Sequence, residues 1–241
     1  ITYHSAYADY PATSSIIIYF ISRIFGRLNM FTAVLPTAVV SSLILVCIYR
    51  IGSMHFREWG IYAVLFAFFT QLFFSTSRSI SPDQPTIVNT LLCFYLAYSA
   101  EIDQHYKRLC FIPLLLIFSF VFRGPIGLVI PAGVLCGFYL VNKDIKKLLI
   151  IGIIAAILLS ICTALLLLAA HYQGGNILMQ NVISGEVLGR LNNATNKSHI
   201  FYYWTNSFGS YAITFPIALL VVLGNLKNII KRPTIDFRFL A

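Results

Sequence analysis

The chain has 241 residues, of which 59% are hydrophobic and 10% charged, and its formal net charge is +9. A typical soluble domain has about 45–50% apolar and about 25% charged residues. The composition therefore excludes a water-soluble globular domain, a disordered chain and a nucleic-acid-binding module, and we expect no nucleic acid partner. It predicts an all-α integral membrane protein, a polytopic bundle of transmembrane helices.

Residues 1–29 are predicted to form a loop and a juxtamembrane helix on the outer face of the membrane. The apolar stretch Ser14–Phe25 is short, contains Arg23 and is followed by Arg27. A short apolar stretch with cations suits a helix that lies in the membrane interface better than one that crosses the bilayer.

Residues 30–225 are predicted to form the transmembrane bundle, with seven spans. A helix needs about 20 residues, and roughly 17 at the shortest, to cross the hydrocarbon core. The stretches that meet or approach this length, in chain order, are Met30–Tyr49, Trp59–Phe74, Pro85–Ala100, Leu109–Phe122, Gly124–Val141, Leu148–Ala170 and Phe208–Leu223.

The distribution of cations predicts which loops face the cytoplasm. If Met30–Tyr49 runs from outside to inside, eleven of the 17 Lys and Arg residues fall in inner segments. Those segments are 50–58, 101–108, 142–147 and the tail from 224, of which 226–241 is a basic cytoplasmic stretch. This asymmetry agrees with the positive-inside rule. It places loop 75–84, the turn at 123–125 and segment 171–206 on the outer side.

Arg123 is the charged residue that is hardest to explain by the needs of a transmembrane helix bundle alone. It stands between two apolar runs, directly before Gly124-Pro125, and the Gly-Pro pair predicts a turn that holds the guanidinium at the outer mouth of the bundle. Two interpretations remain open from the residues alone. The side chain either anchors the turn among lipid headgroups or binds an anion.

Asp83 is the acidic residue of the outer loop 75–84 and precedes a helix predicted to start at Pro85. An Asp at this position commonly caps the helix amides. Arg78 is near enough in the same loop to be the ion partner of this carboxylate.

Segment 171–206 carries further polar residues on the predicted outer side. Ile177–Leu191 mixes apolar and polar residues and suits an amphipathic surface helix, which includes Glu186 and Arg190. No Walker loop, dinucleotide fingerprint or zinc-protease motif is present, and the five cysteines lack metal-binding spacing. We therefore predict neither a cofactor nor a metal site.

The order of these features resembles the GT-C class of lipid-linked-sugar glycosyltransferases. It is similar to the bacterial aminoarabinose lipid A transferases and to the wider protein-mannosyltransferase-like group. The matching segments are Tyr10-Pro11 with Ile24-Phe25-Gly26, then Asp83, Arg123-Gly124-Pro125-Ile126-Gly127-Leu128, Gly185-Glu186-Val187-Leu188-Gly189-Arg190 and Tyr202-Tyr203. Tyr10 and Arg123 each stand where this family usually has Lys, and Val187 stands where it has His.

This resemblance implies an inverting glycosyltransferase of the cell envelope, lipopolysaccharide modification included, located in the bacterial inner membrane with its active site facing the periplasm. Its partners would be a polyprenyl-phosphate-linked sugar, a lipid or glycan acceptor and membrane lipids. Arg123, Tyr10 and Arg78 would bind the donor phosphate, Asp83 would organise the site, and Glu186 and Arg190 would contact donor or acceptor.

The same resemblance predicts a gap in the site. The family's catalytic Asp belongs to an Asp-Glu pair in a first outer loop, tens of residues before the Tyr10-Pro11 segment. Asp9 is the acidic residue available here, and its spacing differs from that of the pair. We therefore expect the chain to be a fragment that lacks the catalytic base.

Two other functions are compatible with these features. A non-enzymatic carrier or flippase for polyprenyl-linked saccharides would also need cations near an outer mouth and an apolar groove. A structural membrane subunit would use the same residues only as anchors and caps.

Overall fold

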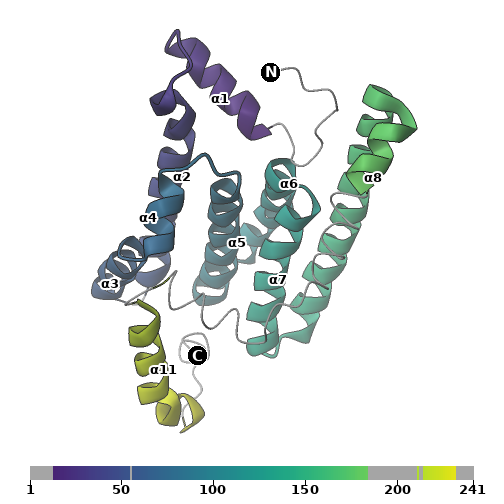
Figure 1. The fold of residues 1–241 in the computed structure, drawn as a ribbon. Helices are drawn as coiled ribbons and strands as arrows, with labels where there is room; N and C mark the ends of the chain where they lie inside the picture. Colours follow the sequence, from purple (N-terminus) through teal and green to yellow (C-terminus); the bar gives the residue numbers. More distant parts are fainter. Residues whose placement is uncertain (1–12, 55, 184–210, 212–213, 232–241) are drawn as a thin grey trace, which may run out of the picture.

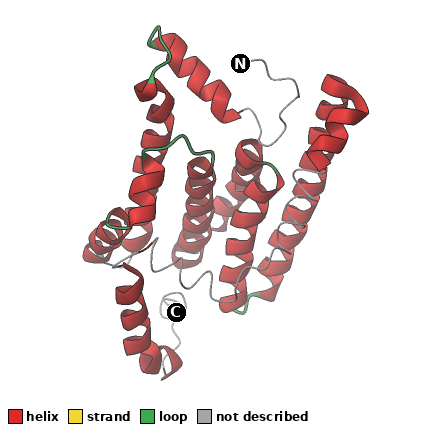
Figure 2. Ribbon diagram, in the orientation of Figure 1, coloured by secondary structure: helices red, strands yellow, loops and turns green. Residues whose placement is uncertain are grey.

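The computed structural model describes residues 13–54, 56–183, 211 and 214–231, which form helices joined by short loops and contain no strand (Figure 2). The all-α prediction is confirmed. The helices, in chain order, are α1 (Thr13–Ile24), α2 (Met30–Gly52), α3 (Arg57–Phe68), α4 (Gln71–Ser77), α5 (Asp83–Asp103), the 3₁₀ helix η1 (Tyr106–Phe111), α6 (Ile112–Arg123), α7 (Pro125–Val141), α8 (Ile145–Ile183) and α11 (Thr214–Lys231).

The first two helices follow the sequence prediction closely. α1 covers almost the same residues as the expected interfacial helix and none of its side chains is buried. α2 begins with a capping box, in which the Asn29 side chain accepts from the Thr32 N–H at 2.8 Å while the Asn29 N–H donates to the Thr32 hydroxyl at 3.0 Å. Such a box satisfies amides that a helix start otherwise leaves free.

The predicted span Trp59–Phe74 is not one straight helix. The chain forms α3 and α4 instead, and the two are bent by 71° at a short break after Phe68. The break falls at Phe69 and Thr70, where the Thr70 hydroxyl donates to the Phe66 carbonyl at 3.0 Å. α3 packs closely on α2, since a Cβ on Gly60 would lie 2.7 Å from the Tyr49 carbonyl oxygen.

The core lies among α5, α6, α7 and α8, which stand side by side in Figure 1. Its large side chains include Leu116, Leu135, Phe138 and Tyr139, each at most 2% exposed. Phe138 meets the Phe94 ring edge to face at 5.6 Å, one of the geometries that aromatic pairs prefer. Apolar side chains also cover the outside of the bundle, as expected of a surface that faces lipid rather than water.

The last two helices differ from the predicted boundaries. α8 continues past the predicted end at Ala170 to Ile183, and Gly175 within it has a φ of +63°. The first part of the expected surface helix Ile177–Leu191 is therefore continuous with α8, and its remainder lies outside the described residues. α11 is described from Thr214 to Lys231, past the predicted end of the last span at Leu223, and of the residues of that span before Thr214 only Tyr211 is described.

The predicted number of seven spans is not confirmed. Within the described ranges, α2 and the Ile145–Tyr172 part of α8 are long and apolar enough to cross a membrane, and α3 with α4 would be a third if the bent pair is one span. α7 is apolar but has 17 residues. The long apolar helices nonetheless identify an integral membrane protein.

The helices of the bundle begin and end at two opposite ends of the molecule. The starts of α2, α5 and α7 and the end of α6 lie at the upper end in Figure 1, which we call the Asp83 end. The ends of α2, α5 and α7 and the starts of α6 and α8 lie at the lower end, which we call the Lys147 end.

Candidate active site

The start of α5 places Asp83 at the end of the bundle. The helix begins at Asp83 itself, two residues earlier than predicted, with Pro82 as its N-cap residue and no side-chain cap. The interpretation of Asp83 as a side-chain cap is therefore wrong. Instead the Asp83 N–H donates to the Ser81 hydroxyl at 3.3 Å, and the carboxylate is free to face a neighbouring helix.

The α6–α7 turn places Arg123 opposite Asp83. Arg123 is the last residue of α6, Gly124 is the turn, and Pro125 begins α7. Gly124 has a φ of +67°, which an L side chain would strain, and its N–H donates to the Phe120 carbonyl at 2.7 Å. The two helices then run close together, because a Cβ on Gly127 would lie 2.2 Å from the Ser119 carbonyl oxygen.

Asp83 and Arg123 form an ion pair between the Asp83 Oδ1 and Arg123 Nη1 atoms. The side chains are 41% and 23% exposed, respectively, so the pair lies at the boundary between the bundle and its surroundings. Arg123 Nε is buried and makes no hydrogen bond with the described part of the chain. The guanidinium thus keeps donors that Asp83 does not use, since it has five N–H groups in all.

Arg78 does not pair with Asp83, contrary to the sequence-based expectation. Its guanidinium carbon lies 4.0 Å from the centre of the Phe74 ring, a cation–π contact within the α4 region. The ion partner of Asp83 among the described residues is Arg123.

Gln84 connects this site to α4, and sequence analysis did not single it out. It is 2% exposed, and its Nε2 donates to the Thr76 hydroxyl at 2.9 Å, which holds the start of α5 against α4. An uncharged polar residue between Asp83 and the helical Pro85 was the only signal in the sequence that could have identified it.

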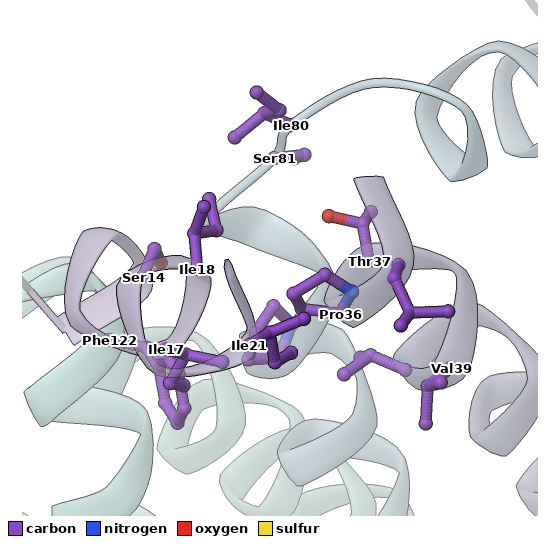
Figure 3. A pocket seen from close by; sticks show the side chains of 13 residues that line it. Ser14, Ile17, Ile18, Ile21, Pro36, Thr37, Val39, Ile80, Ser81 and Phe122 are labelled. Carbon is purple, nitrogen blue, oxygen red and sulfur yellow. The ribbon is translucent and has the colours of Figure 1, made fainter. Parts of the chain in front are cut away.

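An apolar cavity of about 300 Å³ lies at the same end of the bundle. α1 and α2 form most of its wall, with Ser81 and Phe122 among the other lining residues (Figure 3). Asp83 and Arg123 do not line it, but Ser81 and Pro85 are two residues from Asp83 in the chain and Phe122 precedes Arg123. The Thr13 hydroxyl donates to the Val121 carbonyl at 2.7 Å and fastens the start of α1 over α6. Sequence analysis gave α1 no part in the site, but the helix supplies one wall of this cavity.

The other predicted site residues cannot be placed in this arrangement. Tyr10, Glu186 and Arg190, and Asp9 as well, lie outside the described residues. Within the described ranges, no group of three or more His, Cys, Asp or Glu side chains is arranged to hold a metal ion.

Comparison with known families decides the class of the protein. The family model for dolichyl-phosphate-mannose-protein mannosyltransferases matches residues 9–172. The chain belongs to this family. The matched range contains Asp83, Arg123 and all of α1–α7, whereas Glu186 and Arg190 fall outside it. Neither the curated proteins nor the solved structures include a match to the chain.

Membership confirms the GT-C-like family that the sequence motifs indicated. It implies a membrane glycosyltransferase that uses polyprenyl-phosphate sugar donors. For this family member, the ion pair and the cavity at the Asp83 end together provide a charged group and an apolar surface, the two features that a lipid phosphate donor requires.

Proposed function

We propose that this protein transfers a sugar from a polyprenyl-phosphate donor to a lipid or glycan acceptor at the Asp83 end of the bundle. The observation that carries the proposal is the Asp83–Arg123 ion pair at the same end of the bundle as an apolar cavity of about 300 Å³. A lipid phosphate requires a positioned cation for the phosphate and an apolar surface for the tail. The described residues provide both at the Asp83 end.

Arg123 is the proposed ligand of the donor phosphate. A guanidinium offers a planar fork of N–H donors that matches phosphate oxygens. Asp83 takes up Nη1 and fixes the orientation of the group, while Nε has no hydrogen-bond partner in the described structure. Asp83 is thus proposed as a positioning residue that acts through Arg123.

The cavity is the proposed site for the part of the polyprenyl chain next to the phosphate. Its lining is apolar apart from Ser14, Thr37 and Ser81. Its volume is at the lower limit of the roughly 300–1,000 Å³ of small-molecule sites. It therefore holds only the first part of a long isoprenoid, and the rest would remain between the bundle and lipid.

The proposed reaction is an inverting displacement at the anomeric carbon of the sugar. An acceptor oxygen forms a bond to that carbon as the bond from the carbon to the phosphate oxygen breaks, and the electron pair leaves with the phosphate. The acceptor proton passes to a carboxylate base, for which the family resemblance implies the Asp of an Asp-Glu pair and not Asp83. Arg123 would stabilise the charge that grows on the departing phosphate, the kind of electrostatic stabilisation that often dominates catalysis.

The remaining site residues enter the proposal from the family resemblance. Tyr10 and Arg78 would add contacts to the donor phosphate, and Glu186 and Arg190 would contact donor or acceptor. Arg78 lies at the end of α4, on the short loop that leads into Asp83, so it would bring a second positive charge to the same end.

We propose that the Asp83 end faces the periplasm of a bacterial inner membrane. The support is the charge distribution, because the segments between helices at the opposite end, 50–58, 101–108 and 142–147, hold seven of the 17 cations. Cytoplasmic loops of membrane proteins are enriched in Lys and Arg.

The decisive experiment separates transfer from transport. The full-length gene product is reconstituted in liposomes with a polyprenyl phosphate that carries a labelled sugar, together with lipid and glycan acceptors. We expect label on an acceptor, and loss of that product in Arg123→Ala but not in the control Lys143→Ala at the Lys147 end. Movement of the intact donor across the bilayer without transfer would instead identify a carrier.

A further inference from the structure

A second apolar groove lies on the flank of the bundle at the Lys147 end. It runs between η1–α6 and α8 and has a volume of about 130 Å³. Leu109, Ile112 and Leu116 form one side, and Ile150 and Ile154 of α8 form the other. It shares no lining residue with the cavity at the Asp83 end. Its lining combines buried side chains such as Leu116 with Ile150, which is 56% exposed.

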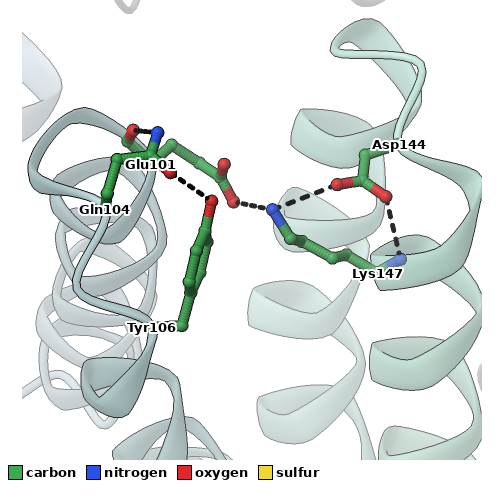
Figure 4. A network of polar contacts seen from close by, with 5 residues as sticks. All are labelled: Glu101, Gln104, Tyr106, Asp144 and Lys147. Carbon is green, nitrogen blue, oxygen red and sulfur yellow. Dashed lines mark hydrogen bonds and ion pairs between the residues drawn. The ribbon is translucent and has the colours of Figure 1, made fainter.

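Lys147 closes this groove at the end of the bundle and is fixed there by a polar network (Figure 4). Its ammonium donates to Glu101 Oε1 at 2.7 Å and lies 3.0 Å from Asp144 Oδ2. The same ammonium lies 4.5 Å from the centre of the Tyr106 ring. Lys147 is therefore neutralised by two carboxylates, and its aliphatic stem serves as wall of the groove.

The network brings the first turn of α8 next to the start of η1, and each of these segments carries further cations. Segments 101–108 and 142–147 together hold five Lys and Arg residues against three carboxylates. Arg108 pairs with Asp103, and Lys147 with Glu101 and Asp144. No described carboxylate pairs with Lys107 or Lys146, which follow Tyr106 and precede Lys147 directly and are both exposed.

We propose that this groove binds an anionic diacyl phospholipid, with the first part of one acyl chain along the η1–α6 and α8 side chains and the headgroup phosphate between Lys107 and Lys146. The charge left over at this end favours an anionic headgroup, and basic pockets between transmembrane helices are a recurrent lipid-binding feature. The site is separate from the donor site, since it lies at the opposite end of α6, and it does not depend on the proposed reaction.

Native mass spectrometry of the full-length gene product in detergent tests this proposal, with phosphatidylglycerol and phosphatidylcholine of the same acyl chains as probes. We expect phosphatidylglycerol to bind more tightly. The double variant Lys107→Gln/Lys146→Gln should lose this preference, by about fivefold for each lysine removed. The matched control Arg50→Gln/Arg57→Gln, which removes two cations from the α2–α3 turn at the same end, should keep it.

A second pair of variants tests the acyl-chain groove. Ile150 and Leu149 are neighbours on α8 with almost equal exposure, 56% and 55%, but only Ile150 lines the groove. Ile150→Trp should fill the groove and abolish phosphatidylglycerol retention, whereas Leu149→Trp should leave it unchanged. Thermal unfolding establishes that both variants fold.

Three results would overturn the proposal. Equal retention of phosphatidylglycerol and phosphatidylcholine would remove the headgroup preference. Equal effects of the two Trp variants on phosphatidylglycerol retention would exclude the groove as the acyl-chain site. Displacement of the bound lipid by soluble glycerol phosphate at the same concentration would show that the cations bind a free phosphate and that the acyl chains contribute nothing.

Discussion

At both ends of this helical bundle, charged side chains from different helices form ion pairs. The two ends differ in whether the cation keeps hydrogen-bond donors that no described residue uses. At the Lys147 end, one ammonium is shared by two carboxylates and lies against an aromatic ring. At the Asp83 end, one carboxylate meets a guanidinium whose Nε has no hydrogen-bond partner within the described structure, and an apolar cavity lies at the same end. An ammonium held between two carboxylates holds helices together, whereas a guanidinium with an unused donor at the same end as a cavity is suited to bind a ligand.

The largest test of this contrast is Arg123→Ala. We expect a loss of sugar transfer of about 10²–10³-fold, the usual effect of removing one donor that stabilises a transition-state charge. Insertion in the membrane should be unchanged, and Arg123→Lys should retain part of the activity because it keeps the charge without the planar fork. Unchanged turnover of Arg123→Ala in a labelled-sugar assay would remove the phosphate-binding role.

A substitution in the α6–α7 packing at the same end should lower the stability of the fold. Gly127→Ala would place a Cβ 2.2 Å from the Ser119 carbonyl oxygen, so α6 and α7 would have to separate. We expect a destabilisation of about 1–3 kcal/mol, as for other overpacked sites, measured by thermal unfolding in detergent. Gly133→Ala on the same helix is the matched control, because a Cβ there has nothing within 4 Å. Equal unfolding temperatures for the two variants would contradict the close helix approach.

At the Lys147 end, the contrast predicts a loss of stability without a loss of catalysis. Glu101→Gln removes a carboxylate from a pair whose side chains are 16% and 24% exposed. We expect about 2 kcal/mol of destabilisation, between the values for exposed and buried pairs, with normal transfer per folded molecule. Asp103→Asn should have a smaller effect, since the Arg108–Asp103 pair is more exposed. A catalytic defect in Glu101→Gln with normal stability would contradict a purely structural role for the Lys147 network.

Asp83→Asn separates a positioning role of this carboxylate from a packing role at the Asp83 end. The amide keeps the shape of the carboxylate but loses its charge, which weakens its bond to Arg123 by about 1.5 kcal/mol and lowers transfer roughly tenfold. The donor KM should rise more than kcat falls, and Asp83→Glu should restore part of the activity. A change in thermal stability alone, with both kinetic constants unaltered, would leave Asp83 only a structural role.

The smallest expected effect concerns pH. The hydrogen bonds that Lys147 donates to Asp144 hold the pKa of that carboxyl below its ordinary value of 3.8. A lowered pKa in the folded state stabilises the protein above pH 3.8, and this contribution is lost as the pH falls from 3.8 through the lower pKa. Asp144→Asn should therefore unfold with a shallower acid dependence than the original chain. Identical acid unfolding curves would show that the pair adds nothing.

The sequence was sufficient for the features that depend on local pattern. Apolar stretches and turn residues predicted the helical class, and Gly124-Pro125 predicted the sharp α6–α7 turn. The side assignment of the loops placed Asp83 and Arg123 on the same face, and the structure brings them into contact.

The predictions that were wrong or missing concern contacts between residues distant in sequence, or the local backbone conformation. Arg78 is five residues from Asp83, but the partner is Arg123, which another helix presents. Lys147 and Glu101 are 46 residues apart, so loop composition showed their charges but not their pairing. The α3–α4 bend occurs without Pro or Gly at the break, which left no compositional signal for it.

The one-residue turn at Gly124 has a mechanical consequence for the whole molecule. The backbone of Arg123 has no loop in which to move, so a displacement of that backbone would tilt the helices on either side. α7 has 17 residues, and at about 1.5 Å per residue it reaches roughly 25 Å. A tilt of only about three degrees therefore shifts its far end by about 1 Å. That end adjoins Asp144, so a shift of the backbone at Gly124 would also move the start of the loop that carries the charged residues of the Lys147 end.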